Sequence, residues 1–105
     1  MKQRDQEPLY SISVAARLIG VSPRILRSYE EAELITPHRT SGQTRFYSNI
    51  DIKKLYLISY LHQEESVNLS GIKVILAIMA GETTFSKLTS MAQEKINHSL
   101  EEEKE

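Results

Sequence analysis

The chain has 105 residues, of which 40% are hydrophobic and 26% charged, with no cysteine and a formal net charge of −1. This length suits one compact domain with an appended element, and the composition is that of a soluble globular protein. Without cysteine there is no disulfide, zinc-thiolate site or thiol-based sensing, and the three histidines stand apart in sequence, so we expect no metal and no cofactor.

Two further features of the sequence bear on location and partners. No stretch reaches the roughly 18 apolar residues of a membrane span, and MKQRDQEP lacks the apolar core of a signal peptide, so we expect a cytoplasmic protein with no membrane partner.

Residues 1–60 hold nine Lys and Arg against six Asp and Glu, whereas residues 61–105 hold four against eight. All six arginines lie at or before Arg45. Because arginine offers a planar fork of donors to guanine and phosphate, the first half of the chain is the candidate nucleic-acid surface. The alternative is that the arginines lie in the first half by chance.

The N-terminal elements are predicted from capping residues. Residues 1–8 are polar and are expected to form a flexible arm, with the folded domain beginning near Leu9. A short helix is predicted to start at a Ser13 cap and to end at Gly20, which tolerates the left-handed conformation of a helix end.

A second helix is predicted over residues 23–32, because Ser22 can cap it and Pro23 suits its first position. At 100° per residue its two faces differ in character. The polar face consists of Arg24, Arg27, Ser28 and Glu31, and the opposite face of Ile25, Leu26 and Tyr29.

The segment TPHRTSGQTRFY, residues 36–47, contains turn residues between two short stretches that can pair as a hairpin. Arg39 and Arg45 flank its tip, residues 40–44, and Tyr47 lies at its base. A hairpin in this position would be a wing beside the two helices.

Three helices are predicted beyond the hairpin. Ser48 and Asp51 have the spacing of a capping box at the start of a helix that is apolar nearly all round to Leu61, and we expect it to be the buried centre of the domain. Asn68 or Ser70 can cap the next helix, which Gly81 closes. Its apolar stripe consists of Ile72, Ile75, Leu76 and Met79.

The last segment is predicted to be a one-sided helix ending in a solvated acidic tail, EEEKE. Its apolar residues recur every three or four positions and so lie on one side of the helix. These residues are Phe85, Leu88, Ala92, Ile96 and Leu100. The expected organisation is therefore an arm over 1–8, a domain over 9–81 and a C-terminal helix with its acidic tail over 82–105.

The first two helices, joined by Gly20, Val21 and Ser22, have the arrangement of a helix-turn-helix, which lays its second helix in the major groove of DNA. Helix pairs of this kind also occur in proteins that do not bind DNA, and surface arginines or a hairpin can serve solubility alone. The arginines on the second helix and on the hairpin together favour DNA binding.

These motifs resemble a known family. Over residues 10–80 the chain looks like the N-terminal domain of MerR-type regulators. The matching runs are ISVAA (12–16), GVSPRILRSYE (20–30), Leu34-Ile35 with Pro37, and Arg39-Thr40 to Gly42 followed by RFYS (45–48). The stretch QEESVNLSGIK (63–73) is similar to the heat-shock repressor (HspR) branch of that family. The resemblance implies a mainly α winged helix-turn-helix fold with a small β-hairpin wing and a C-terminal helix. It also implies that the helix over 82–105 is a dimerisation helix; packing of this helix back onto its own domain is the alternative.

The resemblance also implies which residues meet DNA. The expected contacts are Arg17, Ser22, Arg24, Arg27, Ser28 and Tyr29 from the helices, and Arg39, Thr40, Arg45 and Tyr47 from the wing. At position 28 many members have a second tyrosine where this chain has serine, so a phosphate contact there is expected to be weaker or absent.

We therefore expect a nucleoid-associated homodimer that binds an inverted repeat in double-stranded DNA and represses stress or chaperone genes, with a chaperone as a further partner implied by the HspR resemblance. No small-molecule effector pocket is evident, and no motif for catalysis is present. An excisionase-like or architectural DNA-binding protein, and a protein-interaction module without DNA binding, are the alternatives.

Overall fold

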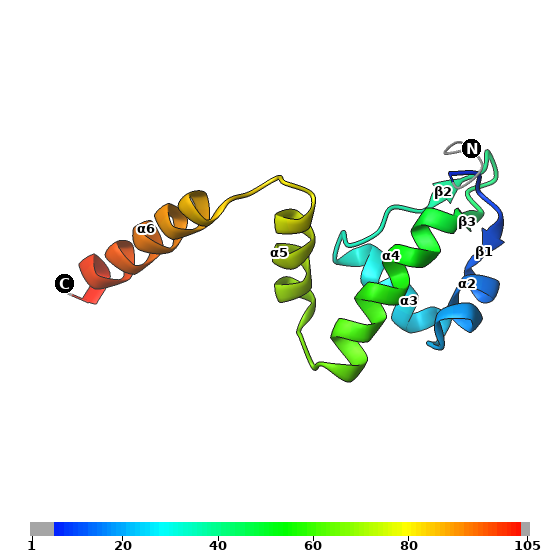
Figure 1. Ribbon diagram of the computed structural model, residues 1–105, viewed down its shortest axis with the longest axis horizontal. Coiled ribbons are helices and arrows are strands. Elements are labelled where there is room, and N and C mark those ends of the chain that lie inside the picture. The colour runs from blue at the N-terminus through cyan, green and yellow to red at the C-terminus, as the bar shows by residue number, and fades with distance from the viewer. Residues whose placement is uncertain (1–5, 104–105) are drawn as a thin grey trace. The chain divides into compact units, whose positions relative to one another are not determined.

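A computed structural model describes residues 6–103 of the chain, so residues 1–5 of the predicted arm and the last two residues of the acidic tail lie outside it. The elements in chain order are β1 (Tyr10–Ser11), α2 (Ile12–Ile19), α3 (Pro23–Glu31), β2 (His38–Arg39), β3 (Arg45–Tyr47), α4 (Asn49–Ser59), the π-helical segment η1 (Tyr60–Glu64), α5 (Leu69–Met79) and α6 (Phe85–Glu103) (Figure 1). The predicted fold class, mainly α with a small wing, is confirmed.

The chain divides into two compact units within α5, one running to Lys73 and the other beginning at Val74. The domain boundary after Gly81 that the sequence predicts stays a prediction. The first unit holds the helix-turn-helix and the sheet, and the second holds the rest of α5 together with α6.

The turn between α2 and α3 follows the predicted chemistry, with one correction. The N-cap of α2 is Ser11, whose Oγ accepts a hydrogen bond from the Val14 amide at 3.4 Å, and not Ser13. Gly20 ends α2 in the left-handed region with φ 78°. Ser22 caps α3 by accepting from the Ile25 amide at 3.2 Å, with Pro23 at the first helical position. Two short helices are thereby fixed across a tight turn.

The wing is part of a three-stranded antiparallel sheet with the order β1-β3-β2. His38 pairs with Phe46 and Arg39 with Arg45, so the predicted hairpin is present. The third strand, β1, was not predicted, because two residues are too few to show a periodicity. It pairs Tyr10 with Tyr47 and so ties the start of α2 to the base of the wing.

Helix α4 begins at the predicted capping box, in which Ser48 and Asp51 each accept a hydrogen bond from the other's amide. The expectation that this helix is buried all round is wrong. Ile52, Leu55 and Ile58 are buried on one face, but Ile50, Tyr56 and Tyr60 on the other sides are 43%, 51% and 52% exposed. A small domain has too few elements to cover every side of one helix.

The core of the first unit lies where α2 packs against both α3 and α4. Its buried hydrophobic side chains are Ala15, Ala16, Ile19, Leu26, Tyr29, Leu34, Ile35, Tyr47, Ile52, Leu55, Ile58 and Ile72. Figure 1 shows α4 running alongside the helix pair, with the sheet at its N-terminal end. This packing fixes the position of α3 relative to the wing.

Helices α5 and α6 also begin at side-chain caps. Asn68, rather than Ser70, caps α5, because its Oδ1 accepts from the Gly71 amide at 2.8 Å. Ile72 of the predicted stripe is fully buried, whereas Met79 is 66% exposed. Thr84 caps α6 through the Lys87 amide at 3.2 Å. None of the described helices is both long and apolar enough to span a membrane.

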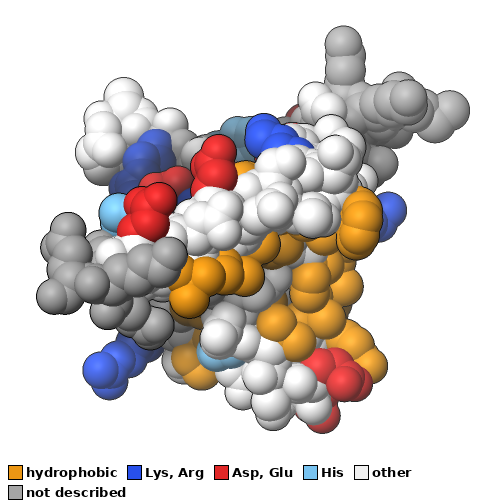
Figure 2. All heavy atoms as spheres, turned by 90° about the vertical axis from the view of Figure 1, so that its left-hand side faces the viewer, with side chains coloured by type: hydrophobic (Ala, Val, Ile, Leu, Met, Phe, Trp, Pro, Cys, Tyr) orange, Lys and Arg blue, Asp and Glu red, His pale blue; other side chains and the backbone are white. Residues whose placement is uncertain are grey.

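The predicted stripe of α6 is largely exposed in the single chain. Phe85, Ile96 and Leu100 are 86%, 60% and 51% exposed, Ala92 is exposed and Leu88 is half-buried. Figure 2 shows hydrophobic side chains at the surface of the molecule, beside acidic groups. A helix that leaves this much apolar surface in water is typical of one that meets a partner.

Candidate nucleic-acid interface

The outward face of α3 carries two arginines that have no partner among the described residues. Arg24 and Arg27 are exposed, and within residues 6–103 neither makes a hydrogen bond or an ion pair. Leu26 and Tyr29, on the opposite face, are 0% exposed and anchor α3 to the core. The faces predicted from the sequence are therefore the faces that the structure shows, and both guanidinium groups are free to bind an external acceptor.

Arg17 adds a third cation in the last turn of α2, where a positive charge also complements the helix dipole. It is exposed and, like the two arginines of α3, has no partner among the described residues. The helix pair thus carries three arginines that no acidic side chain within residues 6–103 pairs with.

The two serines expected at the interface differ in what their hydroxyl groups can still do. Ser22 is exposed, and its Oγ acts as acceptor for the Ile25 amide, so its proton remains available to an external acceptor. Ser28 is half-buried and donates its proton to the Ile25 carbonyl oxygen at 2.5 Å. Ser22 therefore retains a donor for a phosphate, whereas the donor of Ser28 is already used inside the helix.

Two tyrosines expected to contact DNA lie in the core instead, which corrects the expectation for both. Tyr29 and Tyr47 are each 0% exposed. The Tyr29 hydroxyl is 3.0 Å from His62 Nδ1, and burial raises the pKa of Tyr29. Tyr47 donates to the Glu30 carboxylate, and burial first, then Glu30, raise the pKa of Tyr47. Both tyrosines therefore fit a structural role, because a large aromatic side chain can be buried when its hydroxyl group has a hydrogen-bond partner.

The tip of the wing is built from backbone hydrogen bonds around Thr40. Its amide donates to the Thr44 carbonyl at 3.0 Å, its Oγ1 accepts from the Thr44 amide at 3.2 Å, and Gln43 adopts φ 67°. Arg39 is exposed and donates from Nη1 to the Gln43 carbonyl at 3.3 Å. Within residues 6–103, Arg39 makes no ion pair.

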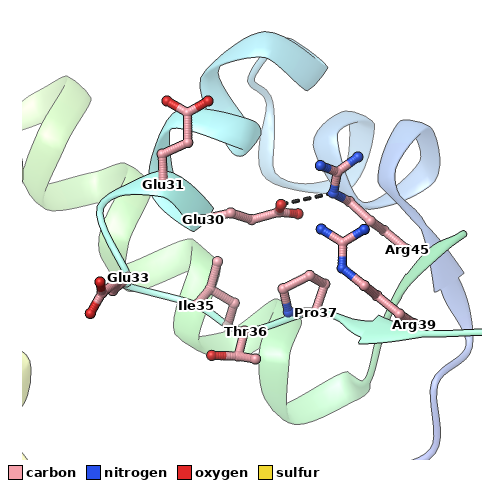
Figure 3. A pocket seen from close by; sticks show the side chains of 8 residues that line it. All are labelled: Glu30, Glu31, Glu33, Ile35, Thr36, Pro37, Arg39 and Arg45. Atoms are coloured by element: carbon pink, nitrogen blue, oxygen red, sulfur yellow. Dashed lines mark hydrogen bonds and ion pairs between the residues drawn. The ribbon is translucent and has the colours of Figure 1, made fainter. Parts of the chain in front are cut away.

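Arg45, the other wing arginine, is already paired. Its Nε donates to Glu30 Oε2 at 2.8 Å, and its side chain is only 29% exposed (Figure 3). The two residues line an open cleft of about 740 Å³ between the end of α3 and the wing, together with Glu31, Glu33, Ile35, Thr36, Pro37 and Arg39. Sequence reasoning missed Glu30; the signal was that Arg45 and Tyr47 alternate on one strand and so share a face.

A helix pair joined by a tight turn, with a paired wing beside its second helix, defines a winged helix-turn-helix protein. Residues 10–77 match the model of the MerR HTH family regulatory proteins. The chain belongs to this MerR family, a family of DNA-binding transcriptional regulators and not of enzymes.

Two relatives show how far the similarity extends. The chain is 45% identical over 74 residues to the putative heat shock protein HspR of Streptomyces coelicolor, covering 70% of this chain and 49% of that protein. It is 33% identical over 93 residues to the HTH-type transcriptional regulator GlnR of Bacillus anthracis, covering 89% and 71%. The chain thus spans about half the length of the first relative.

A solved structure supports the fold. The MerR family regulator HiNmlR, which lacks the sensor domain and is bound to promoter DNA, matches with a TM-score of 0.60 and 22% identity over 90% of this chain and 77% of that one. At this identity the comparison supports the fold alone.

Proposed function

We propose that the chain binds double-stranded DNA sequence-specifically, with α3 in the major groove and the wing on the flanking backbone. The observation that carries this proposal is the pair of exposed guanidinium groups of Arg24 and Arg27 on the outward face of α3, which have no partner in the part of the chain that the structure describes. Membership of the MerR family and the promoter DNA bound to the structural neighbour support it.

The contacts divide by chemistry. Arg24 and Arg27 project from the first turns of α3, where a recognition helix reaches base edges, and an arginine can form a bidentate pair with guanine. Arg17, Ser22 and the N-terminal amides of α3 are suited to phosphate, since the positive end of the helix dipole attracts anions. Arg39 and Thr40 would bind the backbone beside the groove.

We further propose that the active form is a homodimer joined through α6, with each subunit bound to one half of an inverted repeat. The support is the stripe of α6, in which Phe85, Ile96 and Leu100 expose more than half of their surface in the single chain. A two-fold dimer places two identical recognition helices on two half-sites, so the symmetry of the protein is matched by an inverted repeat.

The regulatory outcome we propose is repression of stress or chaperone genes on the nucleoid, with a chaperone as a further partner. The 45% identity to a putative heat shock protein supports this choice over a role like that of GlnR, to which identity is 33%. Deletion of the gene followed by transcript profiling before and after heating tests it. Chaperone transcripts that, before heating, are no higher in the deletion strain than in the parent strain would exclude this role.

Salt-dependent binding tests the DNA contacts. A duplex selected by the native protein from a random pool is titrated at several salt concentrations with Arg27→Ala and Arg39→Ala. Loss of a base contact at Arg27 should cost about 1–3 kcal/mol and relax sequence preference, whereas loss of a phosphate contact at Arg39 should weaken all duplexes and reduce the salt slope by about 1. Lys87→Ala, an exposed cation on α6, is the matched control. Unchanged binding in both arginine variants refutes the proposal.

Sedimentation equilibrium tests the dimer. Replacing Leu88 and Leu100 with aspartate should place charges in the proposed interface and yield monomers, because an unpaired buried charge is costly. Ser90→Asp, an exposed residue on the same helix, adds one charge off the apolar stripe and should leave the dimer intact. Dimers in the double variant would argue against an α6 interface.

A further inference from the structure

We infer that Glu30 is a positioning residue that ties the recognition helix α3 to the wing, and that Arg45 serves this tie instead of contacting DNA. The inference rests on the proposed function of α3 and the wing, and it changes the role expected for Arg45. It starts from the geometry of strand β3.

Residues two apart on a strand point to the same side, so Arg45 and Tyr47 both face α3 while Phe46 faces away. Each of the two reaches a different oxygen of one carboxylate. Arg45 Nε donates to Glu30 Oε2 at 2.8 Å, and the Tyr47 hydroxyl donates to Glu30 Oε1. Glu30 thus holds β3 at two points from the last full turn of α3, as Figure 3 shows for the Arg45 contact.

The burial of this cluster makes the tie specific. The Glu30 side chain is 9% exposed, and that of Arg45 is 29% exposed. A carboxylate removed from water in this way needs its charge and its lone pairs satisfied by the protein, so the native geometry requires both partners. Arg39, opposite Arg45 in the ladder, is exposed and makes no ion pair within the described residues. The wing therefore has one arginine for the tie and one for an external partner.

The tie acts on the distance between the two proposed contact elements. Strand β1 already holds β3 along one edge, through the pairing of Tyr10 with Tyr47. Among the described residues, Glu30 supplies the side-chain hydrogen bonds from α3 to β3, so its loss should let the end of α3 and the wing move apart. If the wing then occupies its binding position about a tenth of the time, the apparent Kd rises about tenfold.

The sign of this effect separates the tie from simple electrostatics. Removing a negative charge from a DNA-binding surface should strengthen DNA binding, because phosphate repulsion is reduced. A positioning role predicts the opposite for Glu30→Gln. Glu31→Gln is the matched control, since Glu31 is the next residue, is exposed and makes no hydrogen bond or ion pair through its side chain within residues 6–103.

The first experiment measures Kd for the duplex selected by the native protein, at a temperature where every variant is folded by circular dichroism. We expect Glu30→Gln to bind about tenfold more weakly and Glu31→Gln to bind as well as, or better than, the native protein. Arg45→Gln is then tested alone and in the Glu30→Gln background. If Arg45 serves the tie, Arg45→Gln weakens DNA binding by itself and adds little further weakening in the Glu30→Gln background. If Arg45 instead contacts a phosphate directly, its loss weakens DNA binding equally in both backgrounds.

The second experiment reads the tie without DNA. The chain has no cysteine, so spin labels at Ser41→Cys on the wing tip and Glu33→Cys just after α3 are unique. We expect a narrow distance distribution in the labelled parent and in Glu31→Gln, and a broader one in Glu30→Gln and in Arg45→Gln.

The outcomes separate this inference from the proposed function. A native protein that selects no duplex would refute the proposed function, while the spin-label distances would still decide whether Glu30 holds the wing. Equal distance distributions in Glu30→Gln and Glu31→Gln, or DNA binding by Glu30→Gln as tight as that by Glu31→Gln, would overturn the positioning role.

Discussion

Tyr47→Phe is the sharpest test of how the wing is held to the core. Tyr47 is 0% exposed and its hydroxyl donates to the Glu30 carboxylate. Phenylalanine retains the ring but removes a hydrogen bond to a charged acceptor, a kind worth about 1.5–3 kcal/mol. For a domain of this size, a loss of about 2 kcal/mol lowers the melting temperature by roughly 10 °C.

The same substitution should change the response of stability to alkaline pH. Burial, followed by Glu30, raises the pKa of Tyr47 well above its ordinary value near 10. The stabilising contribution is therefore fully present below about pH 10 and is lost as the pH rises above it, because the unfolded chain ionises while the folded chain keeps the proton. The free energy of unfolding should fall by up to about 1.4 kcal/mol per pH unit from this residue.

Urea unfolding at pH 8, 10 and 11.5, at one fixed protein concentration, measures both effects. We expect Tyr47→Phe to be less stable than the native protein at pH 8 but to lose stability less steeply above pH 10. Tyr47→Phe should still lose some stability above pH 10, since burial also raises the pKa of Tyr29. Tyr56→Phe is the control because Tyr56 is 51% exposed, and it should keep the steep fall. An equally steep fall in Tyr47→Phe would refute the reasoning.

Three further substitutions test the helix-turn-helix itself by thermal or urea unfolding. Gly20→Ala should cost about 1–2 kcal/mol, because φ is +78° while nothing lies within 4 Å of the added Cβ; an unchanged midpoint would show that the turn relaxes freely. Ser11→Ala should cost about 1 kcal/mol and Ser13→Ala far less, since Ser11 caps α2; the reverse order would restore Ser13 as the cap. Leu26→Ala should cost about 2–5 kcal/mol because the side chain is fully buried, and a smaller loss would mean that α3 is loosely packed.

The local features of the helix-turn-helix could be predicted because each depends on residues close in sequence. Ser22 with Pro23 starts α3, Gly20 ends α2, and Ser48 with Asp51 forms the capping box of α4, all as predicted. The outward face of α3 also follows from helical periodicity. These features need only backbone geometry and neighbouring side chains, so the sequence contains the necessary information.

Other features could not be obtained in this way. Ser11 and Ser13 are equally good caps by residue type, and the pairing of β1 with β3 decides between them by ending the strand at Ser11. Likewise, α4 has apolar residues on every side, and only the packing of α2 shows which of them are buried. In both cases several local choices have similar energies, and long-range contacts select one.

The sequence by itself determined the helix pair, the wing, the arginines of α3 and the family resemblance, because caps, turns and periodicity are local properties of the chain. Only the tertiary structure decided that Tyr29 and Tyr47 are buried and that Arg45 is paired with Glu30, whereas Arg39 makes no ion pair with any residue from 6 to 103. The physical reason is that α3 and β3 approach each other across 15 residues of chain, so the partners of a polar side chain there depend on how the helix and the wing pack together.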